Sequence, residues 1–320
     1  MNSNPEKVVV TAHARLHMGF IDLSGSLGRH FGSIGLALNE IYTRLSLQYA
    51  EQFQVTGASA DRAYKCTQEL CRQLGVSDQL SISIDKAIPE HIGLGSGTQM
   101  TLAIGMALNQ YYQLGHSIRD IACLTERGMR SGIGIGVFEQ GGLVVDGGRG
   151  ENSLTPPVIS QMFVPEDWRF ILVFDQRGQG LHGDQEIEAF EQLSPFSEQE
   201  AARLCYLLVM KALPAIAENN IDEFGDVISE LQQSVGEHFA PAQGGVFTSG
   251  AVAEVMSFFK KQGAVAIGQT SWGPTGFCAV ANEATAHVLI EQVKQQFQHL
   301  QTLNYQITSA RNCGSEIICA

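Results

Sequence analysis

The chain has 320 residues, enough for two ordinary domains or one large one. Hydrophobic residues make up 44%, charged residues only 17%, and there are 34 glycines, which favours a compact enzyme with many tight turns over a disordered or coiled-coil protein. The net charge of −13 and the lack of any Lys/Arg run argue against binding to nucleic acid or an anionic membrane.

Cysteine usage and the length of the apolar runs predict a cytoplasmic protein. The seven cysteines are odd in number and form no Cys-x-x-Cys pair, which is typical of reduced cytosolic thiols. Residues 1–7 are polar and lack the apolar stretch of a signal peptide. The longest apolar runs, such as residues 170–174, have the length of a strand, so none is expected to cross a bilayer.

The first half of the chain predicts strands and helices, taken here in chain order. Strands are expected where apolar residues alternate with polar ones or form short runs, at residues 8–11, 42–49, 80–84 and 143–145. Helices are expected at residues 61–74, 99–114 and 118–127. Gly75 is the predicted C-cap of the first helix, and Ser117 is the predicted N-cap of the third.

A change of composition predicts the domain boundary. Residues 147–157 hold three glycines and two prolines, so we expect an N-terminal domain over 1–155 and a C-terminal α+β domain over 156–320. The second half predicts helices at residues 201–217, 222–237, 251–261 and 284–298, with a further helical region from 186. It predicts strands at residues 170–174, 263–268, 276–280 and 303–308.

One glycine-rich segment lies between a predicted strand and a long helix. Helix N-termini leave amides unpaired and carry partial positive charge, and glycine lets a phosphate approach the backbone. Ser96 and Thr98 add hydroxyls for phosphate or Mg²⁺. An ordinary strand-to-helix turn remains the alternative. The candidate phosphate-binding residues of this loop are Gly93, Gly95, Ser96, Gly97, Thr98 and Gln99.

A second glycine-rich segment covers residues 130–142. Arg130 and Ser131 are candidates for binding phosphate, while Glu139 and Asp146 are candidates for holding a metal ion or acting as acid or base. The alternative is a glycine strand that packs against a helix.

Three further segments carry candidate binding groups. Trp272 lies in a loop of glycine and proline, where it could stack on an aromatic ring or belong to the core. Near the N-terminus, a cation, an imidazole and a carboxylate lie close together in sequence. The loop after residues 170–174 offers two possible anion contacts. The candidates from these segments are Arg15, His17, Arg29, Arg177, His182, Gln269, Ser271, Trp272 and Gly273.

Taken in order, these motifs resemble the GHMP-kinase superfamily. That family has a Pro-x-x-x-Gly-Leu-Gly-Ser-Ser loop that opens a helix, and a glycine-rich loop near the C-terminus. Here the first loop runs from Pro89 to Gly97, with Gly97 in place of the second serine. The resemblance implies a two-domain α+β fold, with an N-terminal domain like domain 2 of ribosomal protein S5 and a ferredoxin-like C-terminal domain.

The chain is most similar to one branch, the β-ribofuranosylaminobenzene 5′-phosphate synthases of methanopterin biosynthesis. This resemblance implies that phosphoribosyl pyrophosphate reacts with 4-aminobenzoate or 4-hydroxybenzoate, with loss of carbon dioxide and pyrophosphate. It implies Mg²⁺ as cofactor, with Ser96 and Glu139 as candidate ligands. Glu139, Asp146 and His17 are the candidate catalytic residues, Arg15, Arg29, Arg130 and Arg177 the candidates for phosphate or carboxylate binding, and a homodimer is expected.

Two other functions remain open. A small-molecule GHMP kinase would use ATP, and many such kinases carry a catalytic carboxylate in the glycine-rich segment after the central helix. Residues 131–137 hold no carboxylate, and Glu139 is the nearest one. A non-catalytic ligand-binding protein of the same fold is the third possibility.

Overall fold

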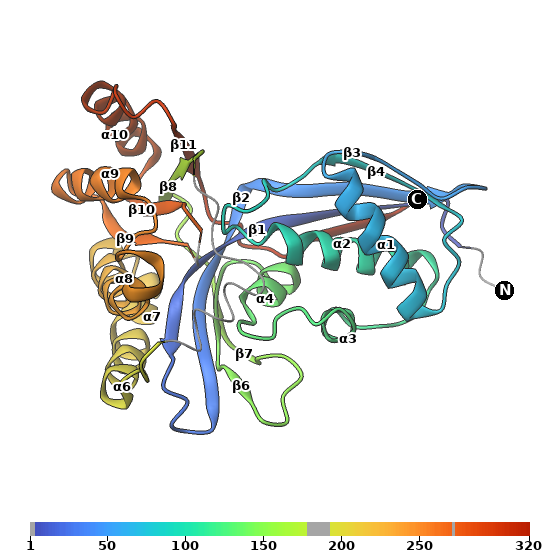
Figure 1. The fold of residues 1–320 in the computed structure, drawn as a ribbon, viewed down its shortest axis with the longest axis horizontal. Coiled ribbons are helices and arrows are strands. Elements are labelled where there is room, and N and C mark those ends of the chain that lie inside the picture. The colour runs from blue at the N-terminus through green and yellow to red at the C-terminus, as the bar shows by residue number, and fades with distance from the viewer. Residues whose placement is uncertain (1–3, 178–192, 271–272) are drawn as a thin grey trace.

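Two β-sheets and the helices packed on them form the protein, seen in Figure 1 as two lobes joined by the long strands β1 and β2. The computed structural model describes residues 4–177, 193–270 and 273–320. The larger sheet has eight strands and the smaller has four, so the predicted α+β class is confirmed. No helix among the described residues is long and apolar enough to span a membrane.

The strands β1 (Lys7–Asp22) and β2 (Arg29–Tyr49) pair antiparallel along almost their whole length. The sequence predicted strands only at 8–11 and 42–49, so both strands were underestimated. The alternation is lost because much of each strand is buried on both faces. Gly35 also weakens the strand pattern of β2 in the sequence. Glycine is needed at this position because a Cβ would lie 2.4 Å from Cγ2 of Ile133.

Three helices of the N-terminal lobe match the predicted positions closely. They are α1 (Ala60–Leu74), α2 (Ser96–Tyr111) and α3 (Ile118–Leu124), and they cover one face of the larger sheet (Figure 1). Gly75 ends α1 in the left-handed conformation, as predicted. Ser117 caps α3 through a reciprocal capping box with Asp120, which confirms the predicted N-cap.

The glycine-rich segment after α3 forms a helix, α4 (Ile133–Glu139), and not the glycine strand considered above. Its glycines serve close packing. A Cβ on Gly134 would lie 3.0 Å from Cγ2 of Thr98, and one on Gly136 would lie 2.6 Å from Cγ1 of Val144. Glycine therefore lets a short helix fit between α2 and the sheet.

The larger sheet takes strands from both sides of the boundary expected at residue 155. Its remaining strands are β3 (Gln54–Gly57), β4 (Leu80–Lys86), β5 (Leu143–Asp146), β6 (Arg149–Gly150), β7 (Val158–Met162) and β12 (Glu316–Cys319). β7 pairs with β5, and β12 pairs with β1. The segment rich in glycine and proline therefore connects strands of one sheet, whereas its composition predicted a domain boundary there.

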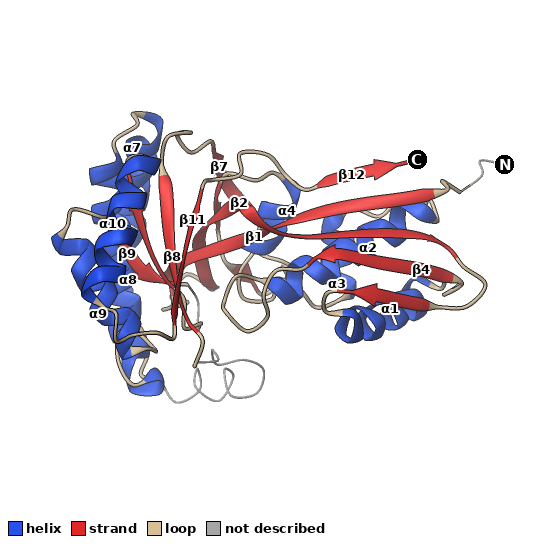
Figure 2. Ribbon diagram, turned by 90° about the horizontal axis from the view of Figure 1, so that it is seen from above, coloured by secondary structure: helices blue, strands red, loops and turns tan. Residues whose placement is uncertain are grey.

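The smaller sheet has a ferredoxin-like arrangement. Its strands are β8 (Arg169–Asp175), β9 (Val265–Gln269), β10 (Gly276–Val280) and β11 (Leu303–Thr308). With α9 (Gly250–Lys261) and α10 (Glu283–Gln296) between them, the chain order is βαββαβ and the sheet order is β11-β8-β10-β9. Figure 2 shows the helices of this lobe along the outer side of the smaller sheet.

A helical layer joins the lobes through one shared core. It consists of α6 (Glu198–Leu207), the π-helical turn η1 (Leu208–Ala212), α7 (Leu213–Ala217) and α8 (Ile221–Gln243). The helix predicted over 201–217 is therefore three continuous helical pieces. Leu16 and Met18 of β1 belong to the same buried cluster as Leu231 of α8 and Phe277 of β10. One hydrophobic core therefore contains side chains from both lobes.

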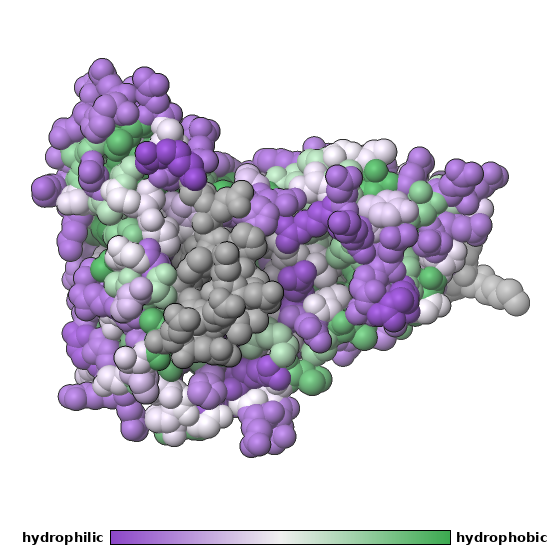
Figure 3. Space-filling view, in the orientation of Figure 1, coloured by the Kyte–Doolittle hydropathy of each residue, from purple (hydrophilic) through white to green (hydrophobic). Residues whose placement is uncertain are grey.

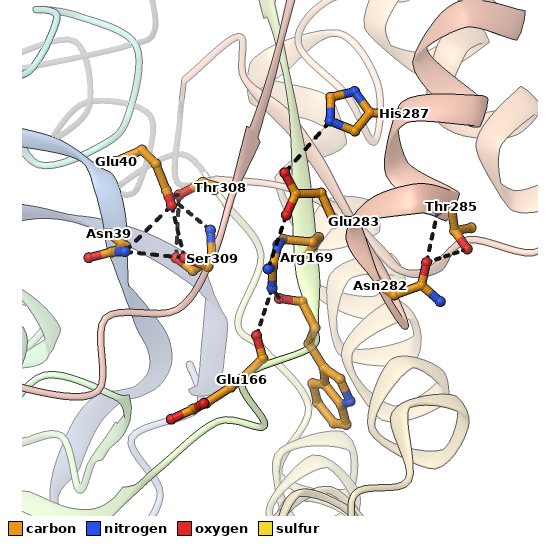
Figure 4. Close-up of polar contacts among 11 residues, drawn as sticks. Asn39, Glu40, Glu166, Arg169, Asn282, Glu283, Thr285, His287, Thr308 and Ser309 are labelled. Atoms are coloured by element: carbon orange, nitrogen blue, oxygen red, sulfur yellow. Dashed lines mark hydrogen bonds and ion pairs between the residues drawn. The ribbon is translucent and has the colours of Figure 1, made fainter.

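Glu40, near the middle of β2, ties the larger sheet to the end of β11. Its carboxylate accepts hydrogen bonds from Thr308 Oγ1 (2.5 Å), Ser309 N (2.9 Å) and Ser309 Oγ (2.9 Å) (Figure 4). Burial alone would raise the pKa of Glu40, but the hydrogen bonds from Thr308 and Ser309 lower it below its ordinary value. The contact therefore stabilises the fold through the charged form.

The substitution Glu40→Gln is expected to lower the free energy of unfolding by about 1 kcal/mol at neutral pH, a value reduced for the exposure of this side chain. Because the folded-state pKa is lowered, this stabilisation is present above the ordinary glutamate pKa of 4.5 and is lost as the pH falls below it. Thermal unfolding of both proteins between about pH 7 and about pH 3 tests this, since the two curves should converge in acid.

Glu283→Gln is the matched control. Glu283 is 58% exposed and pairs with Arg169 at 3.2 Å (Figure 4), so its loss should leave the free energy of unfolding nearly unchanged. Equal destabilisation by both substitutions at all pH values would refute the role given to Glu40.

Candidate functional site

The glycine loop predicted from the sequence does open a long helix. Gly95 is the N-cap of α2, with φ of 80° and no side chain to cap the helix. The first backbone bond of the helix runs from Gln99 N to Gly95 O at 3.0 Å. Within the described part of the chain, the amides of Ser96, Gly97 and Thr98 donate to no backbone carbonyl. The start of α2 therefore presents amide donors and partial positive charge, which favour an anion.

The loop is held from two sides. Arg15 of β1 donates a hydrogen bond from Nη1 to Gly93 O, and Thr270 Oγ1 donates to the same carbonyl at 3.0 Å. A Cβ on Gly273 would lie 2.8 Å from Gly93 Cα, so the two backbones touch. The structure thus brings the first and third glycine-rich segments together. The bond to Gly93 makes Arg15 a support of the loop, and its expected role in substrate binding stays a prediction.

Two arginines that sequence reasoning missed lie beside the loop. A Cβ on Gly97 would lie 2.3 Å from Arg62 Nη2 and 3.9 Å from Arg127 Nη1. Both arginines and Lys65 line a pocket between α1 and the end of α3. Figure 3 shows hydrophilic side chains on this face, where the first turns of α1 lie over α2. Glycine in place of the usual second serine therefore makes room for a guanidinium group.

The charge of these arginines is only partly balanced within the described residues. Arg62 pairs with Glu90 at 3.4 Å, but the buried Nε of Arg127 has no hydrogen-bond partner. Burial lowers the pKa of Arg127, and the neighbouring Arg62 lowers it further, while Cys66 opposes the shift. Because arginine stays protonated in proteins, Arg62 and Arg127 place positive charge next to the amides of α2. Two carboxylates, Glu69 and Glu126, line the same pocket.

The two predicted catalytic carboxylates are engaged elsewhere. Asp146 is fully buried and accepts bonds from Gly148 N (2.9 Å), Gly132 N (2.9 Å) and the hydroxyls of Ser33 and Ser131. Burial raises the pKa of Asp146 against these bonds. This carboxylate organises the start of α4, and the catalytic or metal-binding role expected for it stays a prediction.

Glu139 lies at the C-terminal end of α4, where it is exposed and pairs with Arg119 at 3.4 Å. Gly134, near the other end of α4, is the residue that touches Thr98. The structure therefore does not bring Glu139 together with Ser96, its predicted partner in a metal site. In the described ranges, no three His, Cys, Asp or Glu side chains are grouped so that they could hold a metal ion.

Several predicted binding residues have structural partners instead. Arg29 donates to Gly147 O at 2.8 Å and Gly148 O at 2.7 Å. Arg177 forms two 3.0 Å bonds to Asp175, and these bonds, opposed by burial and aided by Ser249, lower the pKa of that carboxyl to about 2. These two arginines are thus occupied.

Among the polar candidates, Gln99 is fully buried and donates to Gly134 O at 2.8 Å, which ties α2 to α4. Ser131 donates a hydrogen bond from its hydroxyl to the carboxylate of Asp146. Arg130, the residue before it in the sequence, is half-buried. His182, Ser271 and Trp272 lie outside the described residues. The stacking proposed for Trp272 therefore stays a prediction.

His17 is 3% exposed, and neither ring nitrogen has a hydrogen-bond partner. Burial, with a smaller effect of Arg15, lowers the pKa of its imidazole to about 3, so the ring is neutral near pH 7. Its backbone amide donates to Thr270 Oγ1 at 3.1 Å. The predicted site residue His17 therefore does lie next to the threonine that holds the glycine loop.

Comparison with known proteins agrees with this fold and loop. The family model described as the GHMP kinases N-terminal domain matches residues 61–142, and that of the GHMP kinases C-terminal domain matches residues 212–299. The chain belongs to the GHMP kinase superfamily.

Individual proteins similar to this chain include synthases of one named activity. The chain is 31% identical to the beta-ribofuranosylphenol 5′-phosphate synthase of Archaeoglobus fulgidus, over 95% of this chain and 97% of that protein. It is 32% identical to the synthase of the same name from Methanocaldococcus jannaschii, over 70% and 76% of the two chains. The crystal structure of Leishmania major mevalonate kinase shares the fold, with a TM-score of 0.70, 15% identity and coverage of 98% and 100%.

The arginine pair predicts a measurable affinity for a diphosphate. Arg62→Met and Arg127→Met should each weaken the binding of inorganic pyrophosphate about tenfold, because each removes a cation from the start of α2. Titration calorimetry at two salt concentrations measures this, and the loss should be larger at low salt. Arg72→Met is the control, since Arg72 lies on the same helix but pairs with Glu69 at 2.9 Å.

Gly97→Ala tests the role of the missing side chain. Gly97 does not have a positive φ, so alanine should leave the helix intact, whereas its Cβ would displace Arg62. The expected result is weaker pyrophosphate binding with an unchanged melting temperature. Unaltered affinity in this variant and in both arginine variants would exclude the pocket as the diphosphate site.

Proposed function

We propose that the protein transfers the phosphoribosyl group of phosphoribosyl pyrophosphate to a 4-substituted benzoate, with release of carbon dioxide and pyrophosphate. The product would be a β-ribofuranosyl arene 5′-phosphate for methanopterin biosynthesis. Similarity to the archaeal synthases over nearly the whole chain supports this. The observation that carries the proposal is the start of α2, where open amides lie beside Arg62 and Arg127.

The proposed reaction balances without an oxidant or reductant. The bond between C1′ of the ribose and the pyrophosphate oxygen breaks, and its electron pair leaves with pyrophosphate. The ring carbon that bears the carboxylate forms the new bond to C1′. The electron pair of the bond to the departing carbon dioxide then returns to the ring and restores its aromaticity.

The residues of the loop suit the charge changes in this reaction. Negative charge grows on pyrophosphate as its bond to C1′ breaks, and preorganised donors are most effective where charge develops. The amides of residues 96–98, Arg62 and Arg127 would supply such donors. Arg15 would act indirectly, because its bond to Gly93 O holds the loop in place.

Mg²⁺ is included in the proposal because a pyrophosphate leaving group needs its charge neutralised. Ser96, the first residue of α2, offers a hydroxyl beside the loop, whereas Glu139 is committed to Arg119. Mg²⁺ commonly takes few protein ligands and several phosphate oxygens. Ser96 would therefore be the protein ligand, and the substrate would supply most of the others.

The names of the relatives support one of the two benzoates considered. The archaeal synthases are named for a phenol product, which favours 4-hydroxybenzoate over the 4-aminobenzoate considered from the sequence. An ATP-dependent small-molecule kinase has less support. Residues 131–137 carry no carboxylate next to the loop, and Asp146 is already saturated with hydrogen bonds. The likeness to mevalonate kinase, at 15% identity, concerns the fold alone.

The direct test is release of labelled carbon dioxide. The protein is incubated with Mg²⁺, phosphoribosyl pyrophosphate and carboxyl-labelled 4-hydroxybenzoate or 4-aminobenzoate. We expect release that requires phosphoribosyl pyrophosphate and is faster with 4-hydroxybenzoate. Arg127→Met should lower kcat/KM about tenfold, and Arg72→Met should leave it unchanged.

The kinase alternative makes the opposite prediction. No release of carbon dioxide from either benzoate, together with ATP hydrolysis that depends on a small alcohol, would replace the synthase by a kinase. Tight binding of pyrophosphate without either reaction would favour a ligand-binding protein.

A further inference from the structure

The pocket beside the start of α2 extends beyond the two arginines that flank Gly97. It has a volume of about 370 Å³ and is lined by side chains of α1, α2 and the turn after α3. Thr101, which also lines it, lies one turn further along α2 than Gly97, about 6 Å away along the helix axis. A pocket of this size suits a small organic ligand, so it can hold more than a diphosphate.

The wall of the pocket combines apolar side chains with cations. Leu70 and Met100, both buried, form part of the apolar wall. Lys65 is exposed and lies one turn after Arg62 on α1, so the two cations are neighbours on the same helix face. Within residues 4–177, 193–270 and 273–320, Lys65 forms no ion pair. Its ammonium group is therefore available to an anionic ligand.

The two carboxylates that line the pocket differ in their surroundings. Glu69 accepts hydrogen bonds from Arg72 Nε at 2.9 Å and from Gln73 Nε2 at 2.8 Å. Glu126 is exposed, and its carboxylate forms no ion pair with any described residue. A carboxylate repels a simple anion but accepts hydrogen bonds from hydroxyl groups. The pocket therefore suits a ligand that carries both an anionic group and hydroxyls.

The backbone of Glu126 has a conformation that glycine adopts more easily. Its φ is 53°, in the left-handed region, and it directly follows Thr125, the C-cap of α3. Arg127 N bonds to Ala122 O at 2.8 Å, which completes a Schellman turn. Glycine is the usual residue at this position of the turn, since a side chain there costs free energy. A glutamate here instead places a carboxylate beside Arg127 at the pocket.

We propose that this pocket binds the ribose 5-phosphate half of phosphoribosyl pyrophosphate. Lys65 would bind the 5′-phosphate, and Glu126 would accept hydrogen bonds from the ribose hydroxyls. The diphosphate would lie at the amides of α2, with Arg62 and Arg127 between the two ends of the substrate. Part of the pocket is open to solvent, which would leave C1′ accessible to the acceptor. This inference rests on the proposed function, and it names the subsite for the sugar phosphate.

Calorimetry with ribose 5-phosphate, inorganic phosphate and AMP tests the proposal without turnover. With Mg²⁺ present, the protein should bind ribose 5-phosphate about tenfold more tightly than inorganic phosphate, because only the sugar phosphate has hydroxyls for Glu126. Lys65→Met should weaken ribose 5-phosphate about tenfold and change the affinity for pyrophosphate by less than about twofold. Tighter binding of AMP than of ribose 5-phosphate would assign the pocket to a nucleotide and overturn the proposal.

Glu126→Gly removes the carboxylate without disturbing the turn, because glycine takes a positive φ without steric cost. The melting temperature of this variant should not fall. Its affinity for ribose 5-phosphate should fall about tenfold, whereas its affinity for inorganic phosphate should not fall, since a like charge has been removed. Loss of the preference for the sugar phosphate without loss of stability is a result that a purely structural role would not give.

Gln113→Gly is the matched control. Gln113 has φ of 54° after the end of α2, so its backbone is like that of Glu126, but it does not line the pocket. This variant should keep all affinities. Unchanged affinity for ribose 5-phosphate in both Lys65→Met and Glu126→Gly would overturn the subsite. If carbon dioxide release persists in these two variants with an unaltered KM for phosphoribosyl pyrophosphate, the proposed function stands and only this inference fails.

Discussion

The candidate site depends on one backbone contact, that between Gly93 of the helix-opening loop and Gly273 of the C-terminal loop. A Cβ on Gly93 would lie 2.8 Å from Thr270 O, and one on Gly273 would lie 2.8 Å from Gly93 Cα, so the two segments would have to shift. Thr270 and Arg15 then fix the loop by bonding to the same carbonyl of Gly93. The amides of α2 and the arginines that lie beside Gly97 follow directly after this junction in the chain or in space.

The exchange of serine for glycine at position 97 illustrates how a site changes its chemistry on an unchanged fold. In the family pattern a second hydroxyl follows Ser96, whereas here Arg62 occupies the space that Gly97 leaves. The neutral hydroxyl of a serine is thereby replaced by the guanidinium group of Arg62, which pairs with Glu90 at 3.4 Å. A cation in this place favours an anion at the start of α2, and function on a common fold commonly diverges through single positions of this kind.

The sequence predicted most helices, the ferredoxin-like strands and the phosphate loop, because these depend on local patterns such as the Ser117 cap and the glycine run. It predicted only parts of β1 and β2, since burial on both faces removes alternation. It also missed β12, a short strand that exists only because β1 offers an edge. The sequence could not show that the arginines at 15, 29 and 177 bond to carbonyl or carboxylate groups of the same chain. Nothing in the sequence marked Arg62 as a site residue, because single arginines on amphipathic helices are common. Arg127 lies three residues before Arg130 and could have been considered with it.

The pairing of β12 with β1 has a consequence for biosynthesis. The backbone groups of Lys7 and Ala320 exchange hydrogen bonds at 3.2 and 2.9 Å, so segments from opposite ends of the chain complete one sheet. During translation β1 and β2 leave the ribosome early, while β12 follows the entire second lobe. The outer edge of β1 therefore stays open throughout synthesis, and an open edge can pair with other chains. Protection of the nascent protein by chaperones would matter most in this interval.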